Sequence, residues 1–428
     1  MRGGWPESWA AYVAALGRPM RQRRVVLTSF HGHGYRGSPR ALFERMARQE
    51  GWDPIWLTTS PRVASHVSQH WGEHRVALAG TAGYGRALGE AQAVVVSHGR
   101  DDICGLPLPR RAFVLQTYHG LPTKRGELWA VDDTPPSWWK RREIAFRYGR
   151  FDAFLSTSPD VTTLFQRRFG LPRDRFWELG SPAMDTLTAS GVTPTRRQAA
   201  RAALARRLPG YKAGAYVVLY APTFRTRSPE RFFPGLGPDA TGLRGMARRA
   251  FQGLPAYAPG RATRWLPFSD RDLTTLAAWL DREDALLLLR PHPSEVAAVQ
   301  ALLDQSPRIL LAGSDQIEEP DEVLQGVDAV VTDYSGIFLE GLLLDLSAVF
   351  IPYDREHYAR GFAWPYDETT PGPKVATQAA FLAALSAARQ EPAAHSGERR
   401  ALRARFWAAQ SEDATGRVLE RLERALTR

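Results

Sequence analysis

The sequence Ala285-Leu286-Leu287-Leu288-Leu289-Arg290-Pro291-His292-Pro293 passes from an unbroken apolar run directly into a charged turn held by prolines. An apolar run of this length predicts a strand that is buried on both faces, because a half-exposed strand would alternate apolar and polar residues. The same design, a short apolar run ending in polar residues, recurs at 112–124, 216–225 and 329–336. Strands of this kind are typical of parallel sheets covered by helices on both sides.

Helix-like stretches separate the apolar runs almost throughout the chain. The predicted strands are 25–29, 55–58, 93–97, 112–117, 153–157, 216–221, 285–290, 329–332 and 348–352, and the predicted helices are 39–49, 159–169, 193–208, 270–281, 294–303 and 336–344. This alternation predicts an α/β protein built on doubly wound, Rossmann-like parallel sheets. A length of 428 residues suits two such domains facing a cleft.

The alternation of predicted strands and helices is interrupted near residues 190–210, which indicates the domain boundary. We predict a basic and aromatic N-terminal segment (1–24), an N-terminal domain (25–205), a C-terminal domain (206–376) and C-terminal helices (377–428). Residues 228–267 are rich in Gly, Pro and Arg and are predicted to form an insertion in the second domain. Loops of such length are usually functional or disordered.

Composition limits the classes of partner. The formal net charge of +11 favours anionic partners, although the excess of arginine is explained equally well by a GC-rich genome. The single cysteine, Cys104, excludes an internal disulfide and predicts a reducing compartment. No run approaches the roughly 20 apolar residues of a membrane span, and the first 24 residues lack the apolar core of a signal peptide. A cytoplasmic location is therefore expected.

The segment 5–24 has two interpretations. Aromatic and aliphatic residues such as Trp9 and Val13 are followed by a cluster of arginines that begins at Arg18. An amphipathic helix with a basic end is suited to an anionic membrane surface. The alternative is an N-terminal helix that is frayed or docks on the rest of the protein.

The first candidate site follows the strand at 112–117. The pKa of a histidine lies near neutrality, so His119 could accept a proton from an attacking hydroxyl group. The adjacent Gly120 allows a ligand to approach the backbone closely. Lys124 lies close enough along the chain to contact a phosphate. The alternative is a turn that contains a histidine without a catalytic role.

The second group of candidates follows three later strands. Arg290 and His292 end one strand, and Thr223 and Arg225 follow another. The third segment, Thr332-Asp333-Tyr334-Ser335-Gly336, opens a predicted helix, whose first N–H groups would suit an anion. The alternatives are a rigid proline loop, a surface arginine and an ordinary serine cap.

Other common sites are not indicated. No Walker A and no GxGxxG sequence occurs, which argues against ATPases and dinucleotide enzymes. His66, His70 and His74 share helical spacing but have no obvious carboxylate or cysteine ligand beside them, so a solvated helical face is the preferred interpretation. We predict no metal site and no required cofactor, and we leave a dependence on divalent cations open.

Taken in order, these segments resemble the CDP-glycerol glycerophosphotransferase family, the primases and polymerases of teichoic acid, with relatives in capsule synthesis. The resemblance rests on His119-Gly120-Leu121-Pro122-Thr123-Lys124, Tyr220-Ala221-Pro222-Thr223-Phe224-Arg225, Arg290-Pro291-His292-Pro293 and Thr332 to Gly336. Ile351 to Asp354, Arg360 to Phe362, Pro371 to Pro373 and Ser411 to Arg417 add to it. The resemblance implies a GT-B fold.

The resemblance also implies roles. His119 would be the base for the acceptor hydroxyl, and His292 would stabilise the donor pyrophosphate. Donor phosphates would lie near the following residues: Arg225, Arg290, Thr332, Asp333, Ser335 and Gly336. Lys124, Gly120 and Thr223 would assist, and CMP would leave after displacement at the β-phosphorus.

The implied partners are a CDP-glycerol or CDP-ribitol donor and a lipid-linked glycan or polyol-phosphate acceptor. The enzyme would associate peripherally with the anionic inner surface of the cytoplasmic membrane, and nucleic acid is not an expected partner. The sequence departs from the family at Leu121, Gly336 and Glu340, and Pro182-Ala183-Met184-Asp185 lacks the family's cation and amide. The rival interpretations are a GT-B nucleotide-sugar glycosyltransferase, a UDP-sugar epimerase or a non-enzymatic basic binding protein.

Overall fold

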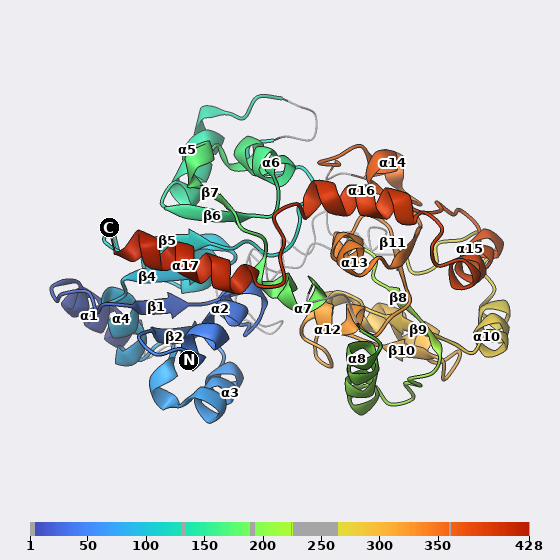
Figure 1. The fold of residues 1–428 in the computed structure, drawn as a ribbon, viewed down its shortest axis with the longest axis horizontal. Coiled ribbons are helices and arrows are strands. Elements are labelled where there is room, and N and C mark those ends of the chain that lie inside the picture. The colour runs from blue at the N-terminus through green and yellow to red at the C-terminus, as the bar shows by residue number, and fades with distance from the viewer. Residues whose placement is uncertain are drawn as a thin grey trace, which may run out of the picture. The chain divides into compact units, whose positions relative to one another are not determined.

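The structure is a computed structural model that describes residues 5–129, 134–188, 193–223, 225, 264–358 and 361–427. The chain divides into two compact units (Figure 1). Unit 1 comprises Met1–Val192, Ala359–Tyr366 and Arg400–Arg428, and unit 2 comprises Thr193–Tyr358 and Asp367–Arg399. The predicted insertion at 228–267 lies outside the described residues except for its last four positions.

Unit 1 is built on a seven-stranded sheet in which all neighbouring strands are parallel. Its strand order is β3-β2-β1-β4-β5-β6-β7. The strands are β1 (Arg24–Leu27), β2 (Asp53–Thr58), β3 (Val76–Leu78), β4 (Ala93–Val96), β5 (Phe113–Gln116), β6 (Ala153–Ser156) and β7 (Phe176–Glu178). The order reverses between β1 and β4, and open α/β sheets bind their ligands at such a reversal.

Unit 2 repeats the design with a five-stranded parallel sheet. Its order is β10-β9-β8-β11-β12, so the reversal falls between β8 and β11. The strands are β8 (Tyr216–Tyr220), β9 (Ala285–Leu289), β10 (Ile309–Leu311), β11 (Ala329–Thr332) and β12 (Ser347–Phe350). Every residue of β8, β9, β11 and β12 is buried, as expected for a sheet covered on both faces.

Helices connect the strands. In unit 1 they are α1 (Trp5–Leu16), α2 (Gly37–Arg48), α3 (Pro61–Trp71), α4 (Ala82–Gly89), α5 (Trp138–Tyr148), α6 (Pro159–Phe169), α7 (Asp185–Thr188) and α17 (Ala414–Leu426). In unit 2 they are α8 (Pro194–Arg207), α10 (Leu273–Arg282), α11 (Gln300–Leu303), α12 (Pro320–Leu324), α13 (Ile337–Gly341) and α15 (Gln378–Gln390). The short α14 (Tyr366–Thr369) and the helix α16 (Ser396–Phe406) contain residues of both units.

Short 3-10 helices complete the chain. They are η1 (Glu73–Arg75), η2 (Gly99–Ile103), η3 (Arg173–Arg175), η4 (Pro182–Met184), η8 (Pro293–Val299), η9 (Leu342–Leu344) and η10 (Arg355–His357). Several α-helices begin where a side-chain oxygen accepts a backbone N–H bond, as Ser158 does at α6 and Thr377 at α15. Gly170 ends α6 in the left-handed conformation that glycine adopts readily.

The C-terminal helix α17 belongs to the core of unit 1. Its residues Val418, Leu419 and Leu422 are buried with Val25 and Leu115 of the sheet. Asp185 fixes the start of this helix, because its carboxylate accepts bonds from the backbone N–H groups of residues 414 and 415, each at 2.9 Å. The segment 411–417, which carries part of the family resemblance, therefore contributes to folding.

The N-terminal helix α1 docks on α4. The hydroxyl of Ser8 donates to the Thr81 carbonyl at 2.7 Å, and a Cβ atom at Gly85 would lie 1.9 Å from the carbonyl oxygen of Ser8. The interpretation of this segment as a docked helix is therefore confirmed. Trp9, Val13 and Leu16 nevertheless remain exposed.

The predicted architecture of two parallel α/β sheets is confirmed, whereas the cleft and the domain boundaries stay predictions. The sequence reading missed β3, β7 and β10, which are three-residue strands too short to give a periodic signal. The helix predicted at 294–303 divides into η8 and α11, and that at 336–344 divides into α13 and η9. Within the described residues, no helix is long and apolar enough to cross a membrane.

Candidate active site

The loops after β1, β4 and β5 meet at the carboxyl edge of the first sheet. The backbone N–H of Phe30 donates to the Ser97 hydroxyl at 3.1 Å, and the N–H of His31 donates to the Asp102 carboxylate at 2.6 Å. His119 enters this group from the loop after β5. The first candidate site therefore lies beside the reversal in strand order.

His119 is oriented by a backbone acceptor. Its Nδ1 atom lies 3.2 Å from the carbonyl oxygen of Ser97. Because a carbonyl only accepts hydrogen bonds, we assign the proton to Nδ1, which leaves an unprotonated Nε2. A neutral imidazole of this tautomer is equipped to accept a proton from a hydroxyl group.

The backbone on both sides of His119 adopts the left-handed region, which the sequence analysis did not predict. Gly120 has a φ of 108°, and Tyr118 before the histidine has a φ of 59°. The conformation at Gly120 is costly for any residue with a Cβ atom. The glycine therefore follows the histidine for a conformational reason.

The surroundings of His119 favour its neutral form. Burial is the largest cause that lowers the pKa of His119 to about 4, and the charges of Arg168, His31 and Arg36 act in the same direction. The residue as a whole is exposed, so solvent tempers the effect of burial. Because the pKa of His119 is lowered, its imidazole is unprotonated at neutral pH.

Lys124 lies in a small assembly of loops. It forms an isolated antiparallel bridge with Phe362, and the Trp364 indole donates to the Pro122 carbonyl at 3.2 Å. Residues 361–366 thus return from far along the chain to unit 1. Sequence reasoning noted Gly361 and Phe362 as family-like but could not place them beside Lys124.

The remaining candidates follow three adjacent strands of unit 2. Thr223 and Arg225 follow β8, Arg290 and His292 follow β9, and Asp333 follows β11. Asp354, which was not a predicted site residue, follows the neighbouring β12. Since all these strands are parallel neighbours, the segments lie along one edge of the sheet. The structure therefore brings this predicted set together.

Arg225 is the centre of an ion-pair network. Its guanidinium forms a two-point contact with Asp354, at 2.9 Å for both bonds, and contacts Asp333 at 2.8 Å. Burial works against the charge, but Asp354 and Asp333 outweigh it and raise the pKa of Arg225. Asp333 also accepts a bond from the Thr223 N–H at 2.7 Å. This network joins the loops after β8, β11 and β12, a role that sequence reasoning did not foresee.

Arg290 also contacts the protein. It donates to the carbonyl oxygens of Ala312 at 3.0 Å, Ile317 at 3.0 Å and Glu318 at 3.1 Å. His292 is half-buried, and its carbonyl accepts the N–H of Glu295 at 2.8 Å. Arg290 thereby holds the loop after β9, which carries His292, against the segment 312–318.

The segment after β11 combines buried and accessible residues. Thr332 is buried and donates to the Ala221 carbonyl at 2.8 Å, whereas Ser335 and Gly336 are half-buried. The following helix, α13, is only five residues long, so its dipole is smaller than we assumed from the sequence. Any anion held here would depend on individual N–H groups.

Glu340 lies on α13. Burial, together with the charges of Asp321 and Glu319, raises the pKa of Glu340 to about 8, and Arg290 acts in the opposite direction. A carboxyl with such a pKa holds its proton at pH 7. It therefore adds little negative charge to the edge of the sheet.

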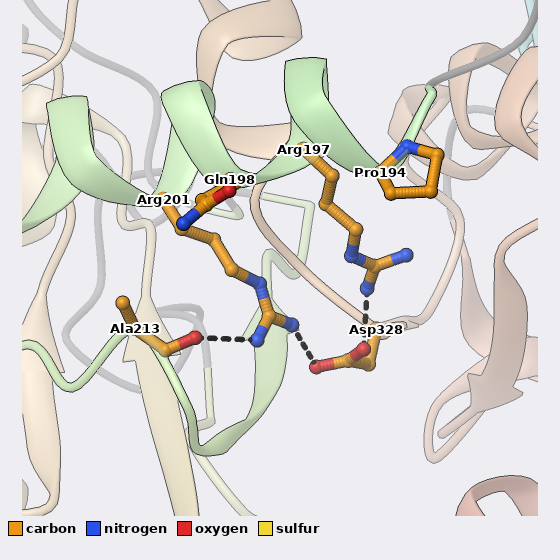
Figure 2. Close-up of a pocket in the computed structure, with 6 residues that line it drawn as sticks. All are labelled: Pro194, Arg197, Gln198, Arg201, Ala213 and Asp328. Carbon is orange, nitrogen blue, oxygen red and sulfur yellow. Dashed lines mark hydrogen bonds and ion pairs between the residues drawn. The ribbon is translucent and has the colours of Figure 1, made fainter.

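A separate pocket lies at the other edge of the second sheet (Figure 2). It is lined by Pro194, Arg197, Gln198, Arg201, Ala213 and Asp328. Asp328 precedes β11, accepts the Val217 N–H at 2.8 Å and pairs with both Arg197 and Arg201, the latter at 2.6 Å. The arginines are thus used to hold α8 against the sheet, so this pocket is not the candidate active site.

Within the described residues, no group of three or more His, Cys, Asp or Glu side chains is arranged to hold a metal ion. The rings of His66 and His70 lie 4.2 Å apart at an interplanar angle of 34°, and the His70 ring bonds to the His66 carbonyl at 2.8 Å.

Comparison with known proteins assigns the family. A family model described as CDP-Glycerol:Poly(glycerophosphate) glycerophosphotransferase matches residues 10–424. The chain belongs to this family. The predicted family and the predicted enzyme class, a glycerophosphotransferase, are confirmed by this match.

Two relatives and one solved structure illustrate the similarity. The chain is 26% identical to the teichoic acid glycerol-phosphate transferase of Staphylococcus aureus (strain NCTC 8325 / PS 47), over 84% of this chain and 82% of that protein. It is 24% identical to the teichoic acid poly(glycerol phosphate) polymerase of Bacillus subtilis (strain 168), over 87% of this chain but only 45% of that protein. The structure of the wall teichoic acid polymerase TagF superposes with a TM-score of 0.74 at 19% identity, covering 100% of this chain and 94% of that chain. The likeness to TagF confirms the GT-B-like fold.

Proposed function

We propose that this enzyme transfers glycerol phosphate, or a related alditol phosphate, from a CDP-alditol to an acceptor hydroxyl in the synthesis of a teichoic acid or capsule-like polymer, with release of CMP. The observation that carries the proposal is the orientation of His119, whose Nδ1 lies 3.2 Å from the Ser97 carbonyl. Family membership supplies the reaction class. The description of the family supports CDP-glycerol as the donor, and the name of a further relative, a teichoic acid ribitol-phosphate polymerase of Staphylococcus aureus, supports CDP-ribitol as the alternative.

In the proposed reaction, Nε2 of His119 takes the proton of the acceptor hydroxyl. The acceptor oxygen forms a bond to the β-phosphorus of the donor, and the bond from that phosphorus to the bridging oxygen breaks. CMP leaves with the electron pair of the broken bond. Such a displacement needs little covalent help, so positioning and charge stabilisation supply most of the acceleration.

Unit 2 holds the donor in this proposal. His292 stabilises the charge that develops on the departing phosphate, and the N–H groups around Ser335 and Gly336 contact the donor phosphates. Arg225 acts by holding Asp333 and the loop that carries it, in keeping with its contacts to Asp333 and Asp354. Lys124 stays a candidate for contact with the acceptor.

We further propose that α5 places the enzyme on an anionic membrane, where a lipid-linked acceptor would be found. This helix exposes three large side chains, Trp138 at 57%, Trp139 at 75% and Phe146 at 67%. Arg141 and Arg142 on the same helix are exposed as well. Aromatic residues combined with cations fit the interface of an anionic bilayer.

A donor screen tests the reaction. Purified enzyme is given a lipid-linked disaccharide acceptor with CDP-glycerol, CDP-ribitol, UDP-glucose or UDP-N-acetylglucosamine, and the products are identified by mass spectrometry. We expect alditol phosphate transfer and CMP release with a CDP-alditol only. Consumption of a UDP-sugar alone would reject the proposal in favour of a glycosyltransferase or an epimerase.

Substitution of the base tests the residue assignment. We expect His119→Ala to lower kcat by at least about 100-fold, the lower end of the range for loss of general-base catalysis. The exposed His70 serves as the matched control, and His70→Ala should keep wild-type kcat. A His119→Ala enzyme with wild-type kcat would contradict the proposed role.

A further inference from the structure

The imidazole of His119 is enclosed between two other rings. The ring of His98 lies parallel to it, with a centroid distance of 3.7 Å and an interplanar angle of 7°. Tyr118 is stacked on it at 4.3 Å and 26°, and Phe30 approaches edge-on at 6.3 Å. Because Tyr118 neighbours His119 in the chain, His98 is the stacking partner that folding brings from another loop.

His98 is itself held firmly. Its Nδ1 atom lies 2.9 Å from the Ser97 hydroxyl, its backbone N–H donates to Asp102 at 2.8 Å, and its side chain is only 15% exposed. The residue before it, Ser97, supplies the carbonyl that holds Nδ1 of His119. One short segment, 97–98, therefore provides both the hydrogen bond to His119 and a surface against its ring.

We propose that His98 is a positioning residue for His119. Its ring fixes the plane of the His119 imidazole so that Nε2 points toward the acceptor hydroxyl. A single hydrogen bond at Nδ1 allows the ring to swing about that bond, whereas a parallel ring at van der Waals distance opposes the swing. The inference rests on the proposed role of His119 as the base.

The parallel stack argues against a proton relay between the two histidines. Hydrogen bonds of an imidazole lie in the plane of its ring, so two rings stacked face to face cannot bond to each other. Each Nδ1 instead faces an oxygen of Ser97. His98 thus acts through contact and not by passing a proton to His119.

Cationic and titratable groups around the pair disfavour protonation of the rings: His31 and Arg36 on the loop after β1 act on both rings, and Arg168 on α6 acts on His119. The carboxylate of Asp102 on η2, 3.9 Å from Nδ1 of His98, acts in the opposite direction. Burial is the largest cause that lowers the pKa of His98, and His119, His31 and Arg36 add to it. If His98 were absent, water would reach one face of the His119 ring, and the pKa of His119 would rise toward its ordinary value.

Two substitutions of His98 test the inference. His98→Asn removes the ring, and we expect kcat to fall about 10- to 100-fold, the cost of a misplaced catalytic group. The KM for CDP-glycerol should stay unchanged. The acid limb of the kcat/KM profile should move up by about one pH unit, toward the ordinary pKa of histidine. His98→Phe keeps a flat ring and should retain kcat within about threefold.

Controls separate this inference from the proposed function. His70→Asn repeats the chemical change at an exposed site and should leave kcat and the pH profile unchanged. Thermal unfolding and the calorimetric affinity for CDP check that each variant is folded. Should His98→Asn fail to fold, the rate of the Phe variant decides the matter.

Two results would overturn the positioning role: wild-type kcat and acid limb in His98→Asn, or a loss in His98→Phe as large as in His98→Asn. An active His119→Ala enzyme would instead reject the proposed function, whatever the His98 variants do.

Discussion

Asp102 shows how a single buried carboxylate organises a site without touching the chemistry. It accepts bonds from the backbone N–H groups of His31 and Ser97, both at 2.6 Å, and of His98 at 2.8 Å. These donors belong to the loops after β1 and β4, so one carboxylate fixes both loops at the reversal in strand order. The two oxygens of the carboxyl group have enough lone pairs to accept all three bonds at once.

The stability of the protein should therefore depend on pH through Asp102. Burial is the main cause that raises the pKa of Asp102 from 3.8 to about 6, and its hydrogen bonds oppose the change. A raised pKa in the folded state means that the folded chain keeps this proton to higher pH than the unfolded chain. The stabilising contribution is complete below pH 3.8 and is lost as the pH rises through about 6.

We expect the free energy of unfolding of the wild type, relative to Asp102→Asn, to fall by about 3 kcal/mol between pH 3.5 and pH 7.5. Urea unfolding of both proteins at several pH values measures this difference. Asp101→Asn controls for the substitution at an exposed neighbouring position. A difference that is constant with pH would show that Asp102 titrates alike in the folded and unfolded chain.

At the scale of elements, the site depends on where parallel strands end. The loops after β8, β11 and β12 are joined through Arg225, and those after β1 and β4 through Asp102. A strand places its last residue at the sheet edge, but the turn that follows decides where the side chain points. The turn after β5 depends on Gly120, whose φ is 108°.

Gly120→Ala should weaken this turn. An alanine at a φ of 108° is strained, so we expect the free energy of unfolding to fall by about 1–3 kcal/mol, or kcat to fall because the turn relaxes and moves His119. Denaturant unfolding and steady-state kinetics together measure the effect.

The control for that change is Gly83→Ala within α4. A Cβ atom there would meet only the Thr81 hydroxyl at 3.6 Å, and alanine favours a helix, so the variant should be as stable as the wild type or slightly more stable. Wild-type stability and kcat in Gly120→Ala would show that the turn tolerates a side chain.

On the scale of the whole molecule, charge and exposed aromatic residues bear on location. The net charge of +11 attracts any anionic surface, but α5 is where large apolar side chains are exposed near cations. The exposed residues of α1, Trp9 and Val13, form a second and separate apolar surface. The two surfaces can be tested against each other.

We expect the triple variant Trp138→Ser, Trp139→Ser and Phe146→Ser to lose most of its binding to phosphatidylglycerol vesicles, because the apolar anchor is removed. Cosedimentation with phosphatidylglycerol and with phosphatidylcholine vesicles measures the effect. Its kcat on a short water-soluble acceptor should be unchanged. The matched control Trp9→Ser with Val13→Ser should still bind, and loss of binding in the control alone would move the membrane contact to α1.

The sequence by itself determined the α/β class, the repeated parallel sheets and the family. Long apolar strands and motifs in a fixed order are local features, so they can be recognised in the sequence alone. It also pointed to Gly120 as a place where a ligand could approach the backbone, whereas the left-handed turn there came only from the structure. The three-residue strands β3, β7 and β10 escaped it because an edge strand is defined by its neighbour more than by its own residues.

Only the tertiary structure decided which side chains touch. It placed His98 on the ring of His119, Phe362 beside Lys124, and both Asp333 and Asp354 on Arg225. Each pair joins residues far apart in sequence. The physical reason is that a contact depends on the strand order and on the turn after each strand, and both are fixed by packing of the whole sheet and not by the residues around any one motif.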